Sequence, residues 1–300
     1  MHNNHHSHLT SLAQFATPNC AGRFALEVLD NLTDGQVGIV IQIFRNTIYV
    51  RTTDEELICI TSHYVKGPVN LNVETNIEFS TIAISDAVYK VDKMLHVRDL
   101  LFPLGKASVH EKAQQSSVSE GLDRRVLEAA NLLAILAVEG SLLDSGSPFF
   151  KDAAKSIRKM MLAAKKGDFI ALQSAISGIV GLGSGSTPSG DDFLAGFLYW
   201  RHQIDQTVDY DIMTVKIENK TSWHSRKFIE YAQEGLVIEP LETFVNALLS
   251  GSEEMITDAI LSLSKIGQSS GLDAGLGVII AASARMDDSV CGNVLKKFGL

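Results

Sequence analysis

The chain has 300 residues, of which 45% are hydrophobic and 20% are charged, which excludes a disordered protein and allows one large domain or two ordinary ones. A formal net charge of −9 argues against broad nucleic-acid binding, which needs a basic surface to displace counterions. A small local anion site stays compatible with this charge, because backbone N–H groups can hold an anion by themselves.

Cysteine usage and the first residues predict a cytoplasmic protein. The widely spaced Cys20, Cys59 and Cys291 form no CxxC pair, so neither a disulfide framework nor a thiolate zinc site is expected. The start, MHNNHHSH, lacks a signal-peptide pattern, and no run of about 18 to 20 apolar residues predicts a membrane helix. We therefore expect no membrane partner, and we interpret residues 1–17 as a flexible N-terminus.

Residues 18–105 are predicted to form a β-rich domain. Short runs rich in Val, Ile and Thr alternate with polar breaks, and no long helical pattern lies between residues 36 and 100. This arrangement favours an antiparallel sheet or a small barrel over a parallel βαβ sheet. The predicted strands are Gln36–Arg45, Thr47–Thr52, Leu57–Ser62, Ile77–Ile84 and Tyr89–Val91.

Residues 106–300 are predicted to form an all-helical domain, which makes the fold class α+β. Apolar residues there recur at helical spacing between polar breaks. The predicted helices are Asp123–Leu143, Pro148–Ala164, Asp168–Val180, Asp191–Gln203, Ser222–Glu234, Pro240–Leu249, Glu253–Lys265 and Leu272–Arg285.

The most informative segment is GLGSGSTPSGDDFLAGF, residues Gly181–Phe197. Its glycines permit positive φ and close backbone approach, and Ser189 or Asp191 could cap the following helix. The free N–H groups and positive dipole of that helix start suit a phosphate or a carboxylate. Asp191 and Asp192 would repel an anion unless one caps the helix, a cation lies between them, or one accepts a substrate N–H. The structural alternative is a capped helix start with tight glycine packing.

A second segment repeats part of the first. Residues Ser189–Gly196 and Ser270–Gly277 share the pattern S-G-x-D-x-x-x-G, and each copy begins an apolar, small-residue helix. The aspartate and the last glycine lie four residues apart, so they share a helix face, and the glycine would let another helix approach beside the carboxylate. We therefore expect the two helix starts to converge, with Asp192 and Asp273 in one site.

A third helix start lies at KTSWH, residues Lys220–His224. Thr221 and Ser222 are candidate caps, and His224 could act as a general acid or base. The alternative is a structural or surface histidine.

At these motifs the sequence resembles the AllH-like family. Its hallmark GLGxGxTPSGDD appears at residues 181–192, and its second hallmark, IGxxSGxD, appears at residues 266–273. A TS element with a following helix that ends in EG appears as Thr221-Ser222 through Glu234-Gly235. One departure lies inside the first loop, where Ser186 replaces the leucine common in the family.

The resemblance implies one subunit of an oxamate carbamoyltransferase in anaerobic allantoin degradation, working with FdrA-like and AllG-like subunits. The implied reaction moves a carbamoyl group from oxalurate to phosphate and gives oxamate and carbamoyl phosphate. All these ligands are small anions that suit helix starts. We expect no cofactor, with a divalent cation at the aspartates as an alternative. The expected catalytic residues are Asp192, Asp273 and His224; the expected substrate-binding residues are Gly183, Ser184, Gly185, Ser186, Thr187, Ser189, Gly190, Asp191, Thr221, Ser222, Ser270 and Gly271.

Two other functions stay open at this point. The chain could be a non-catalytic subunit that binds a metabolite or serves as a scaffold, with catalysis on a partner. It could also be a GHMP-type small-molecule kinase, because Gly181–Ser184 imitates the phosphate loop of those enzymes. The rest of that kinase pattern is missing, since the loop would be expected nearer the N-terminus.

Overall fold

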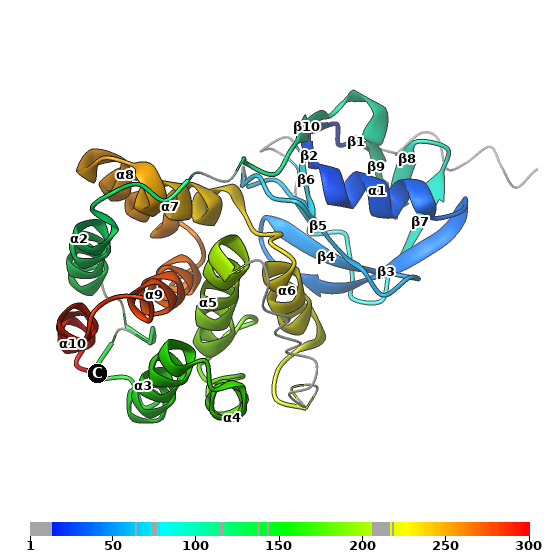
Figure 1. The fold of residues 1–300 in the computed structure, drawn as a ribbon. Coiled ribbons are helices and arrows are strands. Elements are labelled where there is room, and N and C mark those ends of the chain that lie inside the picture. The colour runs from blue at the N-terminus through cyan, green and yellow to red at the C-terminus, as the bar shows by residue number, and fades with distance from the viewer. Residues whose placement is uncertain are drawn as a thin grey trace, which may run out of the picture. The chain divides into compact units, whose positions relative to one another are not determined.

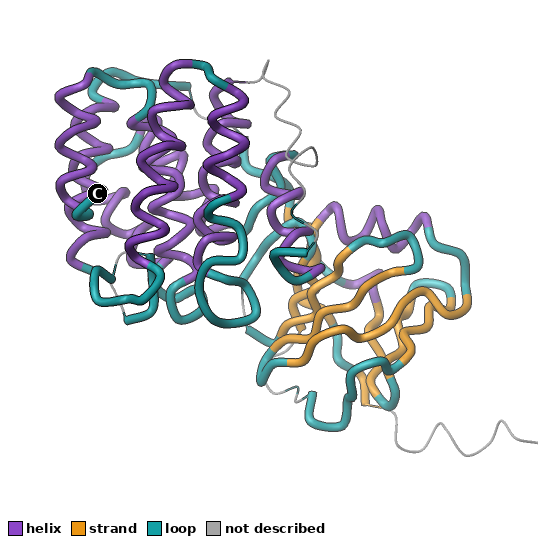
Figure 2. Tube along the Cα trace, turned by 90° about the horizontal axis from the view of Figure 1, so that it is seen from below, coloured by secondary structure: helices purple, strands orange, loops and turns teal. Residues whose placement is uncertain are grey.

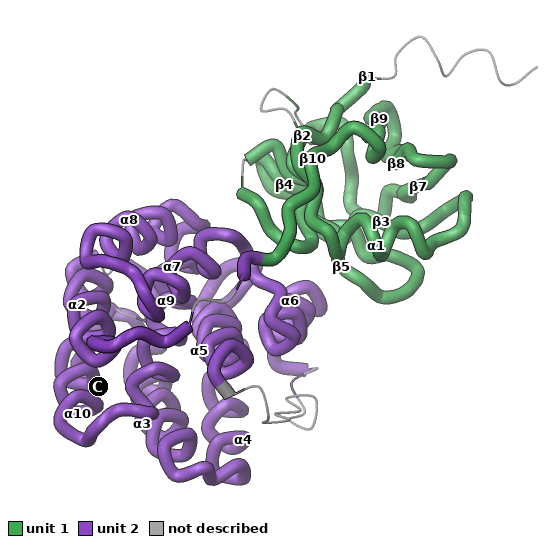
Figure 3. The backbone as a smooth tube through the Cα atoms, turned by 45° about the horizontal axis from the view of Figure 1, so that its top comes forward, with its two compact units in different colours: residues 1–112 green, residues 113–300 purple. Residues whose placement is uncertain are grey.

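The computed structural model describes residues 14–63, 65–73, 77, 79–114, 117–136, 139–142, 144–205, 217 and 219–300. The chain divides into two compact units, Met1–Lys112 and Ala113–Leu300 (Figure 3). Within the described residues the sheet belongs to the first unit, and helices α2 to α10 belong to the second (Figure 2). The predicted α+β class, a β-rich part followed by an all-helical part, is confirmed.

The first unit is built on a 10-stranded sheet in the order β1-β9-β8-β7-β3-β4-β5-β6-β2-β10 (Figure 1). Most neighbouring strands are antiparallel, while β1–β9, β2–β10 and β5–β6 run parallel. A helix, α1 (Arg23–Asn31), and a short 3-10 helix, Leu104–Lys106, complete it. The strands are β1 (Gln14–Phe15), β2 (Pro18–Gly22), β3 (Gly35–Ile43), β4 (Thr47–Thr52), β5 (Leu57–Thr61), β6 (Asn70–Val73), β7 (Ala87–Val91), β8 (Met94–Val97), β9 (Leu100–Pro103) and β10 (Ser108–His110).

One predicted strand, Ile77–Ile84, is wrong. Its described residues form turns and irregular backbone, with Ile82 N–H donating to Phe79 at 3.1 Å and Asp86 N–H donating to Ala83 at 3.1 Å. Ile77, Phe79 and Ile82 are nevertheless buried. The apolar residues reflect burial in the core, which a turn can also achieve, and not a strand ladder. Residues 1–13 of the predicted flexible N-terminus lie outside the described residues.

The second unit contains nine helices in its described residues. Eight correspond to the predicted helices, although α2 ends at Ile135, well before the predicted end at residue 143. The last helix, α10, was not predicted. The helices are α2 (Leu122–Ile135), α3 (Phe150–Lys166), α4 (Phe169–Ser177), α5 (Ser189–Asp205), α6 (Trp223–Gln233), α7 (Glu239–Ser250), α8 (Glu253–Leu263), α9 (Ser270–Ser283) and α10 (Asp288–Lys297). None of the helices described is both long and apolar enough to cross a membrane.

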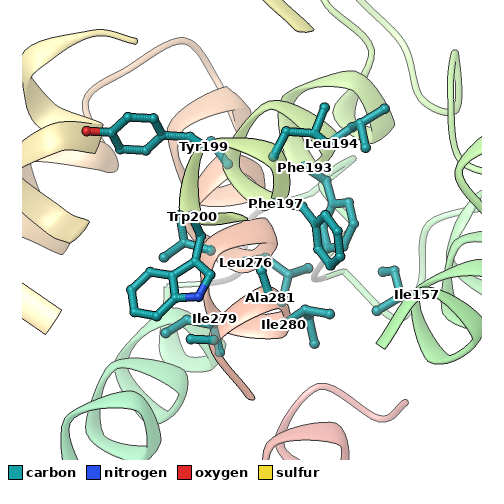
Figure 4. Close-up of a cluster of buried hydrophobic side chains, with 14 of the residues drawn as sticks. Ile157, Phe193, Leu194, Phe197, Tyr199, Trp200, Leu276, Ile279, Ile280 and Ala281 are labelled. Atoms are coloured by element: carbon teal, nitrogen blue, oxygen red, sulfur yellow. The ribbon is translucent and has the colours of Figure 1, made fainter. Parts of the chain in front are cut away.

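The helix α9 forms the centre of the second unit. Every residue from Gly271 to Ser283 is buried, which explains why the sequence shows no polar face there. Its main neighbour is α5, whose Phe193 and Phe197 rings stack with centroids 6.3 Å apart. Figure 4 shows the side chains that fill this contact, including Trp200 of α5 and Leu276, Ile279 and Ile280 of α9.

Two glycines bring the backbones of α5 and α9 into direct contact. A Cβ atom on Gly196 would lie 1.9 Å from the carbonyl oxygen of Ala274, and one on Gly277 would lie 1.9 Å from that of Phe193. Neither distance leaves space for a methyl group, so both positions require glycine. The last glycine of each sequence motif therefore fixes how closely its helix lies beside the other.

Candidate functional site

The first Gly-rich loop, residues 181–188, depends on glycine conformations. Gly181, Gly183 and Gly185 have φ values of +76°, +112° and +101°, which side chains with a Cβ rarely adopt. A Cβ on Gly181 would also lie 1.9 Å from the Lys220 carbonyl oxygen. The loop closes through a 2.8 Å hydrogen bond from Gly190 N–H to the Leu182 carbonyl. These constraints hold the loop against the first turn of α5.

The second loop, before α9, repeats this construction. Gly271 N–H donates to the Ile266 carbonyl at 3.2 Å, as Gly190 N–H donates to Leu182. A Cβ on Gly190 would lie 2.0 Å from the Ile179 carbonyl oxygen, and one on Gly271 would lie 2.0 Å from that of Leu263. The two S-G-x-D copies are therefore the same structural unit, formed twice.

The structure brings the two helix starts together, as the sequence predicts. Thr187 Oγ1 lies 3.4 Å from Ser270 Oγ, and Ser189 Oγ lies 3.5 Å from Ser269 Oγ. The arrangement is reciprocal: Ser270 lies beside the Asp192 carboxylate, while Ser189 lies beside the Asp273 carboxylate. Each motif thus supplies the serine that contacts the aspartate of the other.

Asp273 is fully buried at the start of α9. Its Oδ1 accepts the Leu142 N–H at 2.9 Å, whereas its buried Oδ2 has no hydrogen-bond partner among the described residues. Burial raises the pKa of Asp273 to about 7, although Ser189, Leu142 and Ser269 favour its charged form. Near neutral pH this side chain can therefore either hold or release a proton.

Asp192 is partly exposed, and its pKa is raised, as is that of Asp273. Desolvation raises its pKa well above the ordinary value, and the charges of Asp273 and Asp191 raise it further. Ser270 and Thr187 act in the opposite direction, with Thr187 Oγ1 lying 3.4 Å from Asp192 Oδ2. Burial and the neighbouring carboxylates therefore both favour the protonated form of Asp192.

Asp191 points to the opposite side and ties the loop to α6. Its carboxylate accepts the Gly181 N–H at 2.8 Å, the Ser225 hydroxyl at 2.7 Å and the Thr221 hydroxyl. It is only 1% exposed, and burial is the largest cause of its raised pKa. Asp191 and Thr221, both expected to bind substrate, are thus engaged with each other.

The third helix start, that of α6, lies against the same loop. Ser222 caps α6 by accepting the Ser225 N–H at 3.2 Å, so this predicted cap is confirmed. His224 is buried, and its Nε2 lies 2.7 Å from Ser186 Oγ, 3.1 Å from Ser222 Oγ and 3.0 Å from the Ser186 carbonyl oxygen. Burial lowers the pKa of His224, which favours the neutral imidazole.

The predicted caps of α5 are not used. The helix begins at Ser189, and the Pro188 carbonyl accepts the N–H groups of Asp191 at 2.8 Å and Asp192 at 3.2 Å. Pro188 therefore occupies the capping position. The Ser189 hydroxyl lies toward α9, and the Asp191 carboxylate is directed to α6.

The turn after α2 also reaches the site, and sequence reasoning missed it. Gly140 provides a carbonyl oxygen 3.4 Å from Ser189 Oγ, and Leu142 provides the N–H that binds Asp273. Because both contacts use backbone groups, no side-chain pattern marks them in the sequence. Of the other predicted residues, Ser184 and Gly185 are exposed on the loop, while Gly190 and Gly271 pack against backbone. In the described part, no three or more His, Cys, Asp or Glu side chains gather as a metal site would require.

Comparison with family models gives a match, and the matched segment contains both copies of the S-G-x-D-x-x-x-G motif. Residues 179–282, from the first Gly-rich loop to the last turn of α9, match the family described as oxamate carbamoyltransferase subunit AllH. This segment is AllH-like. The matched AllH-like segment also contains the α6 start with Ser222 and His224, so all three helix starts belong to it. Comparison with curated proteins and with solved structures gives no match.

Protonation of Asp273 should be measurable as a pH dependence of stability. Because its folded pKa, about 7, exceeds the ordinary value, its favourable contribution is complete at pH values below about 4 and is lost as pH rises through 7. The full change corresponds to at most about 4 kcal/mol. Urea unfolding from pH 4 to 8 should show a smaller decline in Asp273→Asn than in the wild type. Parallel curves for the two proteins would show that Asp273 has an ordinary pKa.

Proposed function

We propose that the chain is a subunit of an oxamate carbamoyltransferase-type complex and binds its small anionic substrate where α5 and α9 begin. The proposal is carried by one observation: the two S-G-x-D units exchange serine–aspartate contacts within the AllH-like segment. Such a reciprocal arrangement sets two helix N-termini and two protonatable carboxyls around one point. Helix N-termini favour anions, and a protonated carboxyl carries no charge that would repel a bound anion.

The loop residues Gly183, Ser184, Gly185, Ser186 and Thr187 are proposed to receive the phosphate or carboxylate group. Ser184 and Gly185 are exposed, so a ligand can approach this part of the loop. Ser189, Gly190, Ser270 and Gly271 complete the two helix starts. We assign Asp191, Thr221 and Ser222 to holding the loop against α6, because their side-chain contacts join these elements.

Asp192 and Asp273 are proposed to handle the proton that carbamoyl transfer moves. A phosphate oxygen attacks the carbamoyl carbon of oxalurate, the C–N bond breaks, and the departing oxamate nitrogen gains the proton that phosphate loses. Asp192 is partly exposed and can contact substrate, whereas Asp273 is buried and acts on Asp192 through its charge. The pKa of Asp273, about 7, lies in the range in which general acids work at neutral pH, and burial raises the pKa of Asp192 in the same direction.

The family's description as a subunit supports a complex, which we propose includes FdrA-like and AllG-like chains in allantoin degradation. The test is oxamate-dependent phosphate release from carbamoyl phosphate, measured with this protein alone and with both partner subunits. We expect release only when this chain is present in an assembled mixture. No release from a mixture that size-exclusion chromatography shows to be assembled would exclude oxamate as the substrate.

A further inference from the structure

The Nε2 atom of His224 faces three oxygen atoms and carries a proton. Ser186 Oγ lies 2.7 Å from this nitrogen, the Ser186 carbonyl oxygen lies 3.0 Å from it, and Ser222 Oγ lies 3.1 Å from it. A backbone carbonyl can only accept a hydrogen bond, so the 3.0 Å contact places the hydrogen on Nε2. His224 is therefore a donor toward Ser186 and cannot take the proton of the serine hydroxyl.

The proton on Nε2 decides where the two neighbouring serine hydroxyls direct their own hydrogens. Each hydroxyl oxygen faces a donor, so its hydrogen must turn away from the ring. For Ser222 the acceptor is the Ser186 carbonyl oxygen, at 3.3 Å. For Ser186 the described residues provide no acceptor, because its hydroxyl oxygen contacts only the protonated Nε2. The Ser186 hydrogen is thus available to a molecule that binds at the loop.

The carboxylate of Asp191, whose charge acts on His224, does not compete for this hydrogen. It accepts the Gly181 N–H and the hydroxyls of Ser225 and Thr221. These contacts also fix the first turn of α6, which carries the imidazole. Burial lowers the pKa of His224, so the ring is neutral at neutral pH and Nε2 holds its one proton. The imidazole is therefore a fixed, uncharged donor beside the loop.

We propose that Ser186 donates its hydroxyl hydrogen to an oxygen of a bound phosphate or carboxylate group, and that His224 is the positioning residue that sets the direction of this hydrogen. The inference rests on the proposed function, since it assigns one contact within the anion site of the loop. Ser186 is half-buried, and Ser184 and Gly185 before it are exposed, so a ligand can reach the hydroxyl. Held in this way, the hydroxyl favours a ligand oxygen over an amide or ammonium group, which would bring a second hydrogen to the same place.

The first measurement determines which nitrogen of His224 carries the proton. The full-length chain is labelled with 15N-histidine, and long-range 1H–15N correlation spectra near neutral pH separate protonated from bare ring nitrogens. The variant His224→Gln identifies the signals of His224 by their absence. We expect a proton on Nε2. A neutral ring with its proton on Nδ1 would overturn the proposal, because Nε2 would then accept the Ser186 hydrogen.

The second measurement is the affinity of the full-length chain for inorganic phosphate and for oxamate, in separate calorimetric titrations. Ser186→Ala should weaken the binding of the anion that contacts the hydroxyl by about tenfold or more, the scale of one hydrogen bond to a charged group. Loss for phosphate alone identifies the phosphate group as the acceptor, and loss for oxamate alone identifies the carboxylate. The control Ser174→Ala, which changes an exposed serine of α4, should bind both anions as the wild type does.

Two variants of His224 separate positioning from packing, once circular dichroism shows that both are folded. His224→Leu fills the space but cannot donate, so it should weaken the same anion as Ser186→Ala does. His224→Gln carries an amide N–H where Nε2 lies and should recover most of the affinity. Equal losses in the leucine and glutamine variants would overturn the positioning role.

The remaining outcomes distinguish this inference from the proposed function. Wild-type affinity of Ser186→Ala for both anions, or no binding of either anion by the folded wild-type chain, would overturn the inference. If oxamate-dependent phosphate release persists in the assembled mixture under either result, the proposed function remains intact. Anion binding that depends on Ser186, without any release from an assembled mixture, would support the hydroxyl donor and overturn the proposed function.

Discussion

Asp192→Asn is expected to reduce oxamate-dependent phosphate release by about a hundredfold or more, the scale of a lost general acid or base. Asparagine keeps the size of the side chain and can still contact Ser270 and Thr187, which hydrogen-bond to Asp192. It cannot exchange a proton with a substrate or with Asp273. The measurement is the release rate of the assembled complex from pH 5 to 9, at saturating carbamoyl phosphate.

The pH profile separates this role from a purely structural one. Asp192 and Asp273 both have raised pKa values. As general acids they must be protonated, so the wild type should lose activity as the pH rises and both carboxyls lose their protons. The residual activity of Asp192→Asn should lack that dependence. The matched control is Asp258→Asn, an exposed aspartate of α8 in the same AllH-like segment, which should retain wild-type activity. Full turnover by an assembled Asp192→Asn complex would instead indicate a scaffolding or metabolite-binding subunit.

Gly277→Ala is expected to lower the free energy of unfolding of the helical unit by about 3 kcal/mol or more. The added methyl would lie 1.9 Å from the Phe193 carbonyl oxygen and 2.7 Å from the Phe197 nitrogen, and both atoms belong to the backbone of α5. A flexible side chain could rotate away from such a contact, but two buried helices must separate. Urea unfolding can be followed by tryptophan fluorescence, because Trp200 is buried beside α9 (Figure 4).

Two other glycine variants serve as comparisons for Gly277→Ala. Gly196→Ala places its methyl 1.9 Å from the Ala274 carbonyl oxygen, so its loss of stability should resemble that of Gly277→Ala. Gly292→Ala in α10 meets no atom within 4 Å, and it should leave stability unchanged or raise it by up to about 1 kcal/mol. If all three variants unfold at the same urea concentration, the close contact between α5 and α9 is not present in the protein.

Separation of α5 from α9 in Gly277→Ala or Gly196→Ala should also impair the candidate site. Widening the contact between α5 and α9 would move Ser270 away from Asp192 and Ser189 away from Asp273, because these pairs span the two helices. The glycines four residues after each aspartate thus set the distance between the two carboxyls, and the helix contact and the proposed chemistry depend on one another.

The sequence by itself determined the class of the fold and the location of the chemistry-bearing segments. Alternating Val and Ile runs indicated β4 and β5, helical periodicity indicated α2 to α9, and the S-G-x-D-x-x-x-G repeat indicated two equivalent helix starts. These signals are local, since strand and helix periodicity and the conformational freedom of glycine depend on neighbouring residues. Burial alone does not distinguish a strand from a buried turn, and the strand predicted at Ile77–Ile84 is therefore wrong.

Only the tertiary structure decided how these segments meet. It showed that the serine of each motif contacts the aspartate of the other, that Asp191 is directed to α6 while Asp192 lies toward α9, and that Ser186 lies against His224. It also added the Leu142 N–H, a backbone group that no sequence motif marks. Contacts between residues 34 to 131 positions apart depend on how the helices pack, and the burial that raises the aspartate pKa values exists only once they have packed.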